Sequence, residues 1–166
     1  LVHEPRLLIL DEPTAGVDPV SRRSFWKVIR RLAAAGTTLF VTTHHLDEAE
    51  YCGRVGLMVD GRLVALDTPE ALKTTHVPGT IHAVSGATAR ALGEALAEVE
   101  GVVAVKPFGL ATHVRVTGGL EDAGRFGALL STRGVGDAVV EPAEATLEDV
   151  FLELVERESR QAGEEG

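Results

Sequence analysis

The sequence lacks three features that would each indicate a class of protein. Its one cysteine, Cys52, cannot form an internal disulfide, so a reducing cytoplasm is the default compartment. The formal net charge of −9 argues against a nucleic-acid-binding surface, which would need a basic patch. No uninterrupted apolar run approaches the roughly 18 residues of a membrane-spanning helix. Cys52 itself is better interpreted as a small buried hydrophobe than as a reactive thiol.

The remaining composition is that of an ordinary globular chain, 45% hydrophobic and 25% charged. Its 166 residues are enough for one ordinary domain or two small ones. The segment His76-Val77-Pro78-Gly79 is the candidate junction, because the pattern of strands and helices changes after it. We therefore expect one domain at residues 1–76 and a second at residues 77–166.

The most informative segment is an apolar run that ends in two adjacent carboxylates, Leu7-Leu8-Ile9-Leu10-Asp11-Glu12, followed by Pro13. Such an aliphatic run predicts a strand that is buried on both faces of a parallel sheet. Asp11 and Glu12 would then lie at the C-terminal edge of the sheet, where open α/β folds bind ligands. The alternative, for this segment alone, is a buried strand that runs into an acidic turn.

A helix and a second strand are expected next. Asp18 followed by Pro19 is typical of a helix start. We expect this helix to be amphipathic, to end near Gly36 and to keep its basic residues on a solvated face. Those basic residues are Arg22, Arg23, Lys27, Arg30 and Arg31. Residues 37–43 predict a second buried strand, with His44 at its end.

The pair His44-His45 could indicate a metal site, but no second cluster of ligands accompanies it.

Three motifs now stand in a fixed order: residues 7–12, Ala15-Gly16-Val17-Asp18, and residues 41–50 around Thr43-His44. Together they resemble the ATP-binding cassette (ABC) transporter ATPases. The sequence around His44 is most similar to that of subunits of drug and polymer exporters. The first motif resembles the Walker B strand of that family, the second its D-loop and the third its switch-histidine loop. Any one of these motifs would be weak evidence, whereas their order and spacing make the resemblance specific.

The resemblance implies an α/β fold in which residues 1–76 form the C-terminal part of a P-loop nucleotide-binding domain. The Walker A loop, G-x-x-x-x-G-K-[ST], whose backbone amides cradle phosphates, does not occur in the sequence. The LSGGQ-like signature of the family is also missing, and would normally lie just upstream of Leu1. We therefore expect the chain to be the C-terminal portion of a longer protein and to be inactive alone.

The resemblance also implies roles for individual residues in ATP hydrolysis. Asp11 would hold Mg²⁺, through water, beside the β and γ phosphates of ATP. Glu12 would be the general base that orients the attacking water, and His44 would contact the γ-phosphate. Gly16 would permit the tight path of the D-loop. Asp18 would reach towards the Walker A loop of a partner subunit and couple the two sites.

The implied assembly is a head-to-tail dimer of two ABC ATPase subunits, with two ATP molecules between them, on an integral-membrane permease. This would place the chain in the cytoplasm, peripheral at the inner face of the membrane. Nucleic acid is not an expected partner, because the chain is acidic. Ala15 departs from the serine that many relatives carry, so any hydrogen bond from that hydroxyl is lost.

Residues 77–145 predict a small α+β domain with the order β-α-β-β-α-β, a split-βαβ arrangement. Thr146 and Asp149 form a capping-box pattern at the start of a final amphipathic helix. This helix could dock across a dimer or pack on its own domain. Residues 158–166 are expected to be a disordered polar tail.

Two other functions stay open from the sequence. The chain could be an inactive docking or regulatory fragment, which the missing Walker A loop favours and the intact Glu12 and His44 disfavour. It could also be a non-transport ABC ATPase that acts on ribosomes or DNA, which the acidic charge and the exporter-like residues 44–50 disfavour. A ligand-sensing role for the split-βαβ domain would rest on fold analogy alone.

Overall fold

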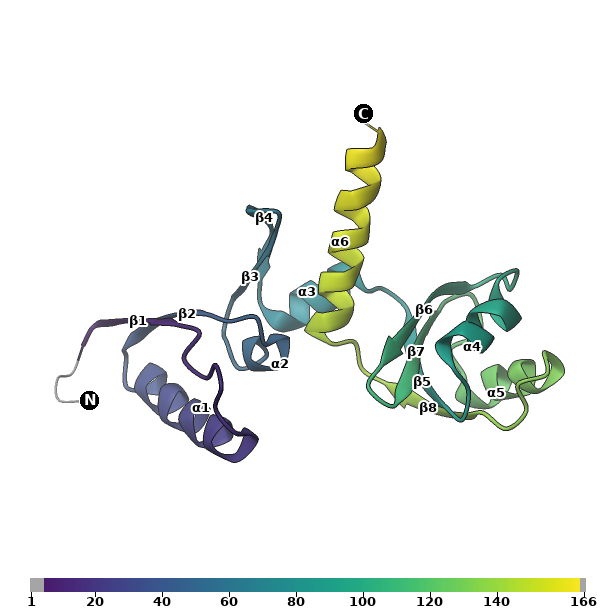
Figure 1. Ribbon diagram of the computed structural model, residues 1–166, viewed down its shortest axis with the longest axis horizontal. Coiled ribbons are helices and arrows are strands. Elements are labelled where there is room, and N and C mark those ends of the chain that lie inside the picture. Colours follow the sequence, from purple (N-terminus) through teal and green to yellow (C-terminus); the bar gives the residue numbers. More distant parts are fainter. Residues whose placement is uncertain (1–4, 165–166) are drawn as a thin grey trace. The chain divides into compact units, whose positions relative to one another are not determined.

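The structure is a computed structural model that describes residues 5–164 (Figure 1). The chain divides into two compact units. Unit 1 comprises residues 1–76 and 146–166, and unit 2 comprises residues 77–145. The boundary between residues 76 and 77 coincides with the expected junction. The final helix, which we assigned to the second domain, belongs instead to unit 1.

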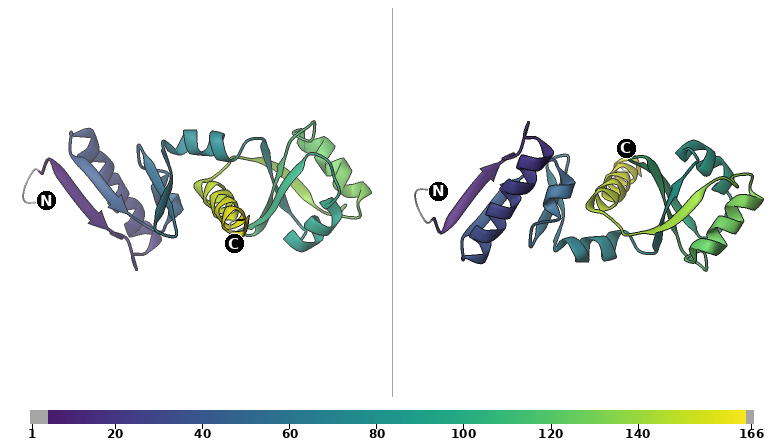
Figure 2. Two further views of the ribbon diagram at one scale, coloured as in Figure 1. Left: turned by 90° about the horizontal axis from the view of Figure 1, so that it is seen from above. Right: turned by 90° about the horizontal axis from the view of Figure 1, so that it is seen from below.

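Unit 1 begins with a strand–helix–strand motif, in which strands β1 and β2 pair in parallel. Its elements are β1 (Leu7–Asp11), α1 (Pro19–Ala34) and β2 (Thr38–Thr42). Helix α1 lies along one face of the two strands (Figure 2). The register places Asp11 directly opposite Thr42, so the last residues of the two strands meet at one edge.

The prediction that β1 is buried on both faces is wrong for the described residues. Exposure alternates along the strand, and Leu7 and Ile9 are 54% and 67% exposed. On β2, Phe40 is 60% exposed. The physical reason is that the sheet of β1 and β2 has two strands and α1 covers only one of its faces. A strand of a parallel sheet is buried on both sides only where helices cover both faces.

Helix α1 is amphipathic, as its sequence predicts. Trp26 and Ile29 are buried, whereas most of its basic residues are exposed. The ring of Trp26 lies 5.6 Å from that of Tyr51, and the guanidinium of Arg30 lies 5.0 Å from the centre of the Tyr51 ring. Trp26 therefore packs inside unit 1, while Arg30 extends over the outside of the same aromatic cluster.

The rest of unit 1 consists of a short helix, a hairpin and two helices: α2 (Leu46–Ala49), β3 (Val55–Val59), β4 (Arg62–Asp67), α3 (Pro69–His76) and α6 (Leu147–Glu164). Asp60 and Gly61 join the strands of the hairpin with φ angles of +48° and +77°. Positive φ at both central residues is the geometry that a two-residue hairpin turn requires, and Asp-Gly suits it.

Helix α6 packs against α2, α3 and β3, as Figure 1 shows for α3. The predicted capping box is confirmed. The Asp149 N–H donates to Thr146 Oγ1 at 3.2 Å, and the Thr146 N–H donates to Asp149 Oδ2 at 2.9 Å. Glu50 adds a link, because its Oε1 accepts from the Leu147 N–H at 3.2 Å and its Oε2 pairs with Lys73 Nζ at 3.0 Å.

The predicted disordered tail is wrong for residues 158–164, which continue helix α6. These residues include glutamate, arginine, glutamine and alanine, which are good helix formers, so the helix does not end where its apolar stripe ends. Residues 165 and 166, also assigned to the tail, lie outside the described residues.

Unit 2 is a four-stranded antiparallel sheet with two helices: β5 (Thr80–Ser85), α4 (Ala89–Leu96), β6 (Val102–Phe108), β7 (Ala111–Val116), α5 (Ala123–Thr132) and β8 (Val139–Ala143). The strand order is β6-β7-β5-β8. Each of the two helices therefore connects strands that are separated by a third one, which confirms the split-βαβ prediction.

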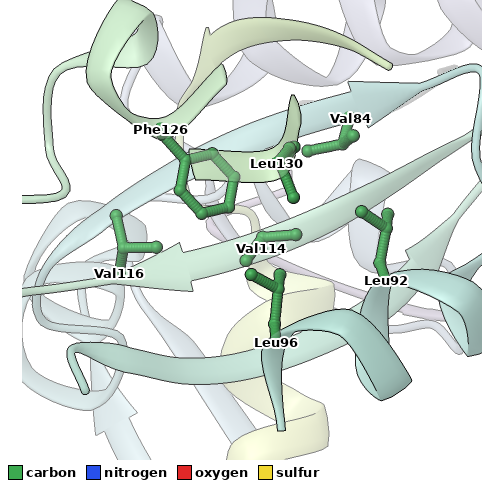
Figure 3. Close-up of a cluster of buried hydrophobic side chains, with 7 residues drawn as sticks. All are labelled: Val84, Leu92, Leu96, Val114, Val116, Phe126 and Leu130. Atoms are coloured by element: carbon green, nitrogen blue, oxygen red, sulfur yellow. The ribbon is translucent and has the colours of Figure 1, made fainter. Parts of the chain in front are cut away.

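The core of unit 2 lies between the sheet and its two helices (Figure 3). Leu92 and Leu96 come from α4, and Phe126 and Leu130 from α5. The sheet contributes Val84, Val114 and Val116. All seven side chains are at most 2% exposed. Thr88 caps α4 through the Ala91 N–H, and Asp122 caps α5 through the Arg125 N–H, so both helices begin at side-chain caps.

Replacing Gly101 with alanine is expected to destabilise unit 2 by about 1–3 kcal/mol. Gly101 has a φ of +89°, and an added Cβ would lie 2.5 Å from the Thr117 carbonyl oxygen. Gly93, within α4, is the matched control, because its Cβ would meet nothing within 4 Å. Gly93→Ala should be neutral or stabilising. Urea denaturation followed by circular dichroism measures both, and equal midpoints for the two variants would contradict the expectation.

Candidate functional site

The C-terminal edge of β1 and β2 brings together three predicted site residues: Asp11, Glu12 and His44. Asp11 ends β1, and Oδ1 of its carboxylate accepts a hydrogen bond from the Thr42 hydroxyl. This contact follows from the parallel register, which sets the two residues opposite each other. Thr42 thus fixes one carboxylate oxygen of Asp11, and the exposed side chain of Asp11 keeps its other oxygen available for a ligand.

Glu12 leaves the strand in an unusual conformation. Its φ is +43°, in the left-handed region that non-glycine residues rarely occupy. Its N–H still donates to the Thr42 carbonyl oxygen at 3.0 Å, so the turn begins directly after the ladder. Backbone strain of this kind clusters at functional sites. The side-chain alternation of the strand therefore does not determine the direction of the Glu12 side chain.

The carboxylate of Glu12 pairs with the imidazole of His44. Glu12 Oε2 lies 2.7 Å from His44 Nδ1, across 32 positions of sequence. A carboxylate only accepts hydrogen bonds, so Nδ1 carries the hydrogen and Nε2 is left for another partner. The side chains are 37% and 66% exposed, so a ligand can reach both. The ring of His45 contacts that of His44, with centroids 4.1 Å apart and an angle of 38° between the planes.

The loop after Glu12 contains the other two predicted site residues. Gly16 has a φ of +71°, which suits glycine, and nothing surrounds the position of a Cβ there. Asp18 caps α1, because its Oδ1 accepts from the N–H groups of Val20 and Ser21 at 2.9 and 3.0 Å. Hydrogen bonds from the Ser21 side chain and N–H hold the pKa of Asp18 below its ordinary value. This cap therefore stabilises the helix at neutral pH and is lost as the pH falls through the folded-state pKa.

A buried carboxylate beside the site did not emerge from the sequence. Glu48, on α2, is 0% exposed. Its Oε1 accepts from the Thr14 hydroxyl and lies 3.3 Å from Arg22 Nε, while its Oε2 accepts from Thr43 Oγ1 at 3.2 Å. Its burial depends on the folding of three separate segments around it, for which the local pattern holds no signal.

The residues present fit a magnesium ion that is shared with a nucleotide, but not a cage made of protein alone. Within residues 5–164 there is no cluster of three or more His, Cys, Asp or Glu side chains that could hold a metal. Mg²⁺ is commonly bound through one or two carboxylates, water and the phosphates of a substrate. Asp11, with one oxygen fixed by Thr42 and an exposed side chain, has the chemistry for that arrangement.

Two further observations concern the surroundings of the site. Burial raises the pKa of the Cys52 thiol, and the negative charge of Glu48 raises it further, which favours the unreactive thiol form. None of the helices between residues 5 and 164 combines the length and the apolar character needed to cross a lipid bilayer.

Comparison with known proteins finds ATP-binding proteins of ABC transporters among the relatives of this chain. A probable multidrug ABC transporter ATP-binding protein of Escherichia coli is 56% identical over 73 residues, which are 44% of this chain and 13% of that protein. A fluoroquinolones export ATP-binding protein of Mycobacterium tuberculosis is 38% identical over 159 residues, 95% of this chain and 46% of its own length. A Nod factor export ATP-binding protein of Bradyrhizobium diazoefficiens is 35% identical over 162 residues, 95% of this chain and 49% of its own length.

No family model matches the chain. Among solved structures, UvrA2 from Deinococcus radiodurans is similar with a TM-score of 0.37 and 25% identity, over 49% of this chain and 13% of that one. The chain spans about half the length of the two export proteins that it matches over 95% of its residues. Over that shared portion, the chain is a homologue of the ATP-binding proteins of ABC transporters.

Proposed function

We propose that this chain forms part of the ATP-hydrolysing subunit of an ABC-type exporter. The observation that carries the proposal is the Glu12–His44 pair beside the Thr42-anchored Asp11, at the C-terminal edge of two parallel strands. Relatives that match 95% of the chain are named as export ATP-binding proteins, which supports the same function. Export is proposed without a specific cargo, because fluoroquinolones and Nod factor differ chemically.

In this proposal Glu12 is the general base. A base must lie within hydrogen-bond reach of the water it deprotonates. Glu12 directly follows β1 at the C-terminal edge of the two strands, in a left-handed backbone conformation. Its hydrogen bond to His44 Nδ1 fixes the direction of the carboxylate. A phosphate oxygen only accepts hydrogen bonds, so in this proposal His44 donates from Nδ1 to Glu12 and from Nε2 to the γ-phosphate, as the doubly protonated ring does. One residue then senses the phosphate and orients the base at the same time.

The proposed cofactors are ATP and Mg²⁺. Asp11 would hold the ion through a water molecule, and the ion would neutralise charge on the β and γ phosphates. Thr42 keeps the Asp11 carboxylate directed at the edge of the sheet. Phosphoryl transfer depends mainly on positioning and charge neutralisation, so these fixed side chains are the contribution that the chain itself makes.

The complete site would need a Walker A loop and a signature loop, which the 166 residues do not contain. We propose a head-to-tail dimer with a second ABC ATPase subunit, in which Gly16 and Asp18 face the partner. Asp18 accepts the two backbone hydrogen bonds of the α1 cap on Oδ1, and its carboxylate is exposed, so a partner subunit could reach it. An integral-membrane permease would hold the assembly at the cytoplasmic face of the membrane.

Two alternatives make different predictions. An inactive docking fragment would bind a partner without any dependence on Glu12, and a non-transport ABC ATPase would hydrolyse ATP without a permease. Affinity purification of the chain from membranes separates them. Recovery of a permease together with ATPase activity supports the export proposal, whereas activity without a permease favours the non-transport enzyme.

His44→Ala is expected to lower the rate of ATP hydrolysis by about 10²-fold or more in the assembly that contains a Walker A loop. The variant removes both the Glu12 hydrogen bond and the proposed phosphate contact. His45→Ala is the control, because the His45 ring lies beside that of His44 but makes no side-chain hydrogen bond as the cap of α2. Release of inorganic phosphate at saturating ATP measures both variants. Equal activity of the two variants would contradict the role of His44.

A further inference from the structure

The buried carboxylate of Glu48 touches segments on both sides of the proposed catalytic pair. Thr14 lies between Glu12 and Gly16, in the loop that follows β1. The hydrogen bond from its hydroxyl to Glu48 therefore connects this loop to α2. Thr43 directly precedes His44, and its hydroxyl also accepts from the His45 N–H at 3.0 Å. Glu48 accepts from both hydroxyls, one on each oxygen.

Arg22, on helix α1, belongs to the third segment of the chain that contacts Glu48. Its Nε lies 3.3 Å from Glu48 Oε1, and its backbone N–H donates to the Asp18 carbonyl oxygen at 2.9 Å in the first turn of α1. Thr14 and Arg22 therefore flank Gly16 and Asp18, the loop that would face a partner subunit. Both ends of this loop converge on a single carboxylate.

The burial of Glu48 makes these contacts specific. A carboxylate without exposed surface is costly unless it is paired and hydrogen-bonded, so the partners cannot be replaced by water. Because α2 is a single short turn, the contacts also define where that turn sits. Two separate loops, after β1 and after β2, are thereby held at a fixed separation.

We propose that Glu48 is a positioning residue that couples the loop of Gly16 and Asp18 to the Glu12–His44 pair. This inference rests on the proposed function. A shift of that loop at a subunit interface would move Thr14 and Arg22, and the Glu48 side chain would move with them through its contacts to both. Because Glu48 also accepts a hydrogen bond from Thr43, the shift would change the position of the neighbouring His44. Glu48 touches no reacting atom and acts through its partners.

The test is kinetic and uses the ATPase assembly that contains the full chain. Glu48→Gln keeps the size of the side chain but removes the charge that faces Arg22. The expected result is a fall in kcat of about ten- to hundred-fold, with a change in KM for ATP of about threefold or less. Glu50→Gln is the matched control, because Glu50 lies two positions away and contacts Lys73 and the Leu147 N–H instead.

A second variant removes one hydrogen bond without changing the charge. Thr14→Val is similar in shape to the parent and should lower kcat in the same way, while Thr14→Ser, which keeps the hydroxyl, should restore it. The double variant of Thr14→Val and Glu48→Gln should lose less than the product of the two single losses, because both act on one contact. These variants decide the question if Glu48→Gln does not fold.

Amide hydrogen exchange on the 166-residue chain gives a readout that needs no ATPase activity. Glu48→Gln should speed exchange at Val17, whose N–H donates to the Thr14 carbonyl oxygen at 3.0 Å, and at His45, whose N–H donates to Thr43 Oγ1. Glu50→Gln should change neither. A parental kcat for both Glu48→Gln and Thr14→Val would overturn the inference while the proposed function stands. An assembly that does not hydrolyse ATP even with parental residues would overturn the proposed function, and the inference with it.

Discussion

Glu12→Gln is expected to lower ATP turnover by about 10²–10⁴-fold while leaving ATP binding within about threefold of the parent. Glutamine keeps the size of the side chain, and its carbonyl oxygen can still accept from His44 Nδ1, so the geometry of the pair survives. The amide cannot take a proton from water at neutral pH. Only the step that needs a base is removed, which is why binding and turnover should separate.

The measurement compares phosphate release with the binding of ATP by calorimetry, in the assembly that contains this chain and a Walker A loop. Glu70→Gln, the same chemical change at an exposed position of α3, is the control and should retain parental turnover. Turnover of Glu12→Gln at the parental rate would exclude Glu12 as the base. Loss of ATP binding would instead indicate that the carboxylate positions the nucleotide.

The elements around the site could be predicted from sequence because each has a local signal. The aliphatic run before Asp11 predicts a strand, the Asp18-Pro19 pair predicts a helix start, and Asp60-Gly61 predicts a hairpin. The order of strands and helices in unit 2 was likewise sufficient for its split-βαβ topology. In all these cases the information lies within a few residues or in the order of elements.

The contacts that shape the site could not be predicted, because they depend on how distant segments meet. Asp11 and Thr42 contact each other only in one parallel register, and the sequence does not specify register in a strand with weak alternation. The left-handed φ of Glu12 belongs to the turn that follows β1, and the aliphatic pattern of the strand holds no signal for it. The hydrogen bonds of Glu48 join residues that are up to 34 positions apart.

The placement of α6 shows the same limit for domain assignment. Continuity of the chain suggested that the final helix belongs with residues 77–145, which precede it. Its N-terminus is instead capped by Glu50 of unit 1, through a hydrogen bond between residues 97 positions apart. The apolar stripe of a helix predicts that it packs on something, but the complementary surface is known only from the fold.

Phe126→Ala is expected to cost unit 2 about 3–5 kcal/mol of folding free energy. Phe126 is 0% exposed and belongs to the cluster in Figure 3, where it lies beside Val116 on the sheet and Leu130 on its own helix. Its ring also stacks on that of His82, with centroids 4.9 Å apart and an angle of 13° between the planes. The truncation leaves a cavity in a close-packed core and removes this ring contact.

A loss of that size is a large part of the 5–15 kcal/mol that stabilises a typical domain, so unit 2 should populate unfolded states at moderate urea. Methyl NMR signals of Val84, Val114 and Val116 report its core directly during a urea titration. Leu110→Ala is the control, because Leu110 is fully exposed and its truncation should cost less than about 0.5 kcal/mol. If Phe126→Ala moved the midpoint no further than this control, helix α5 would not be held by its buried face, and the split-βαβ unit would depend on its backbone pairing instead.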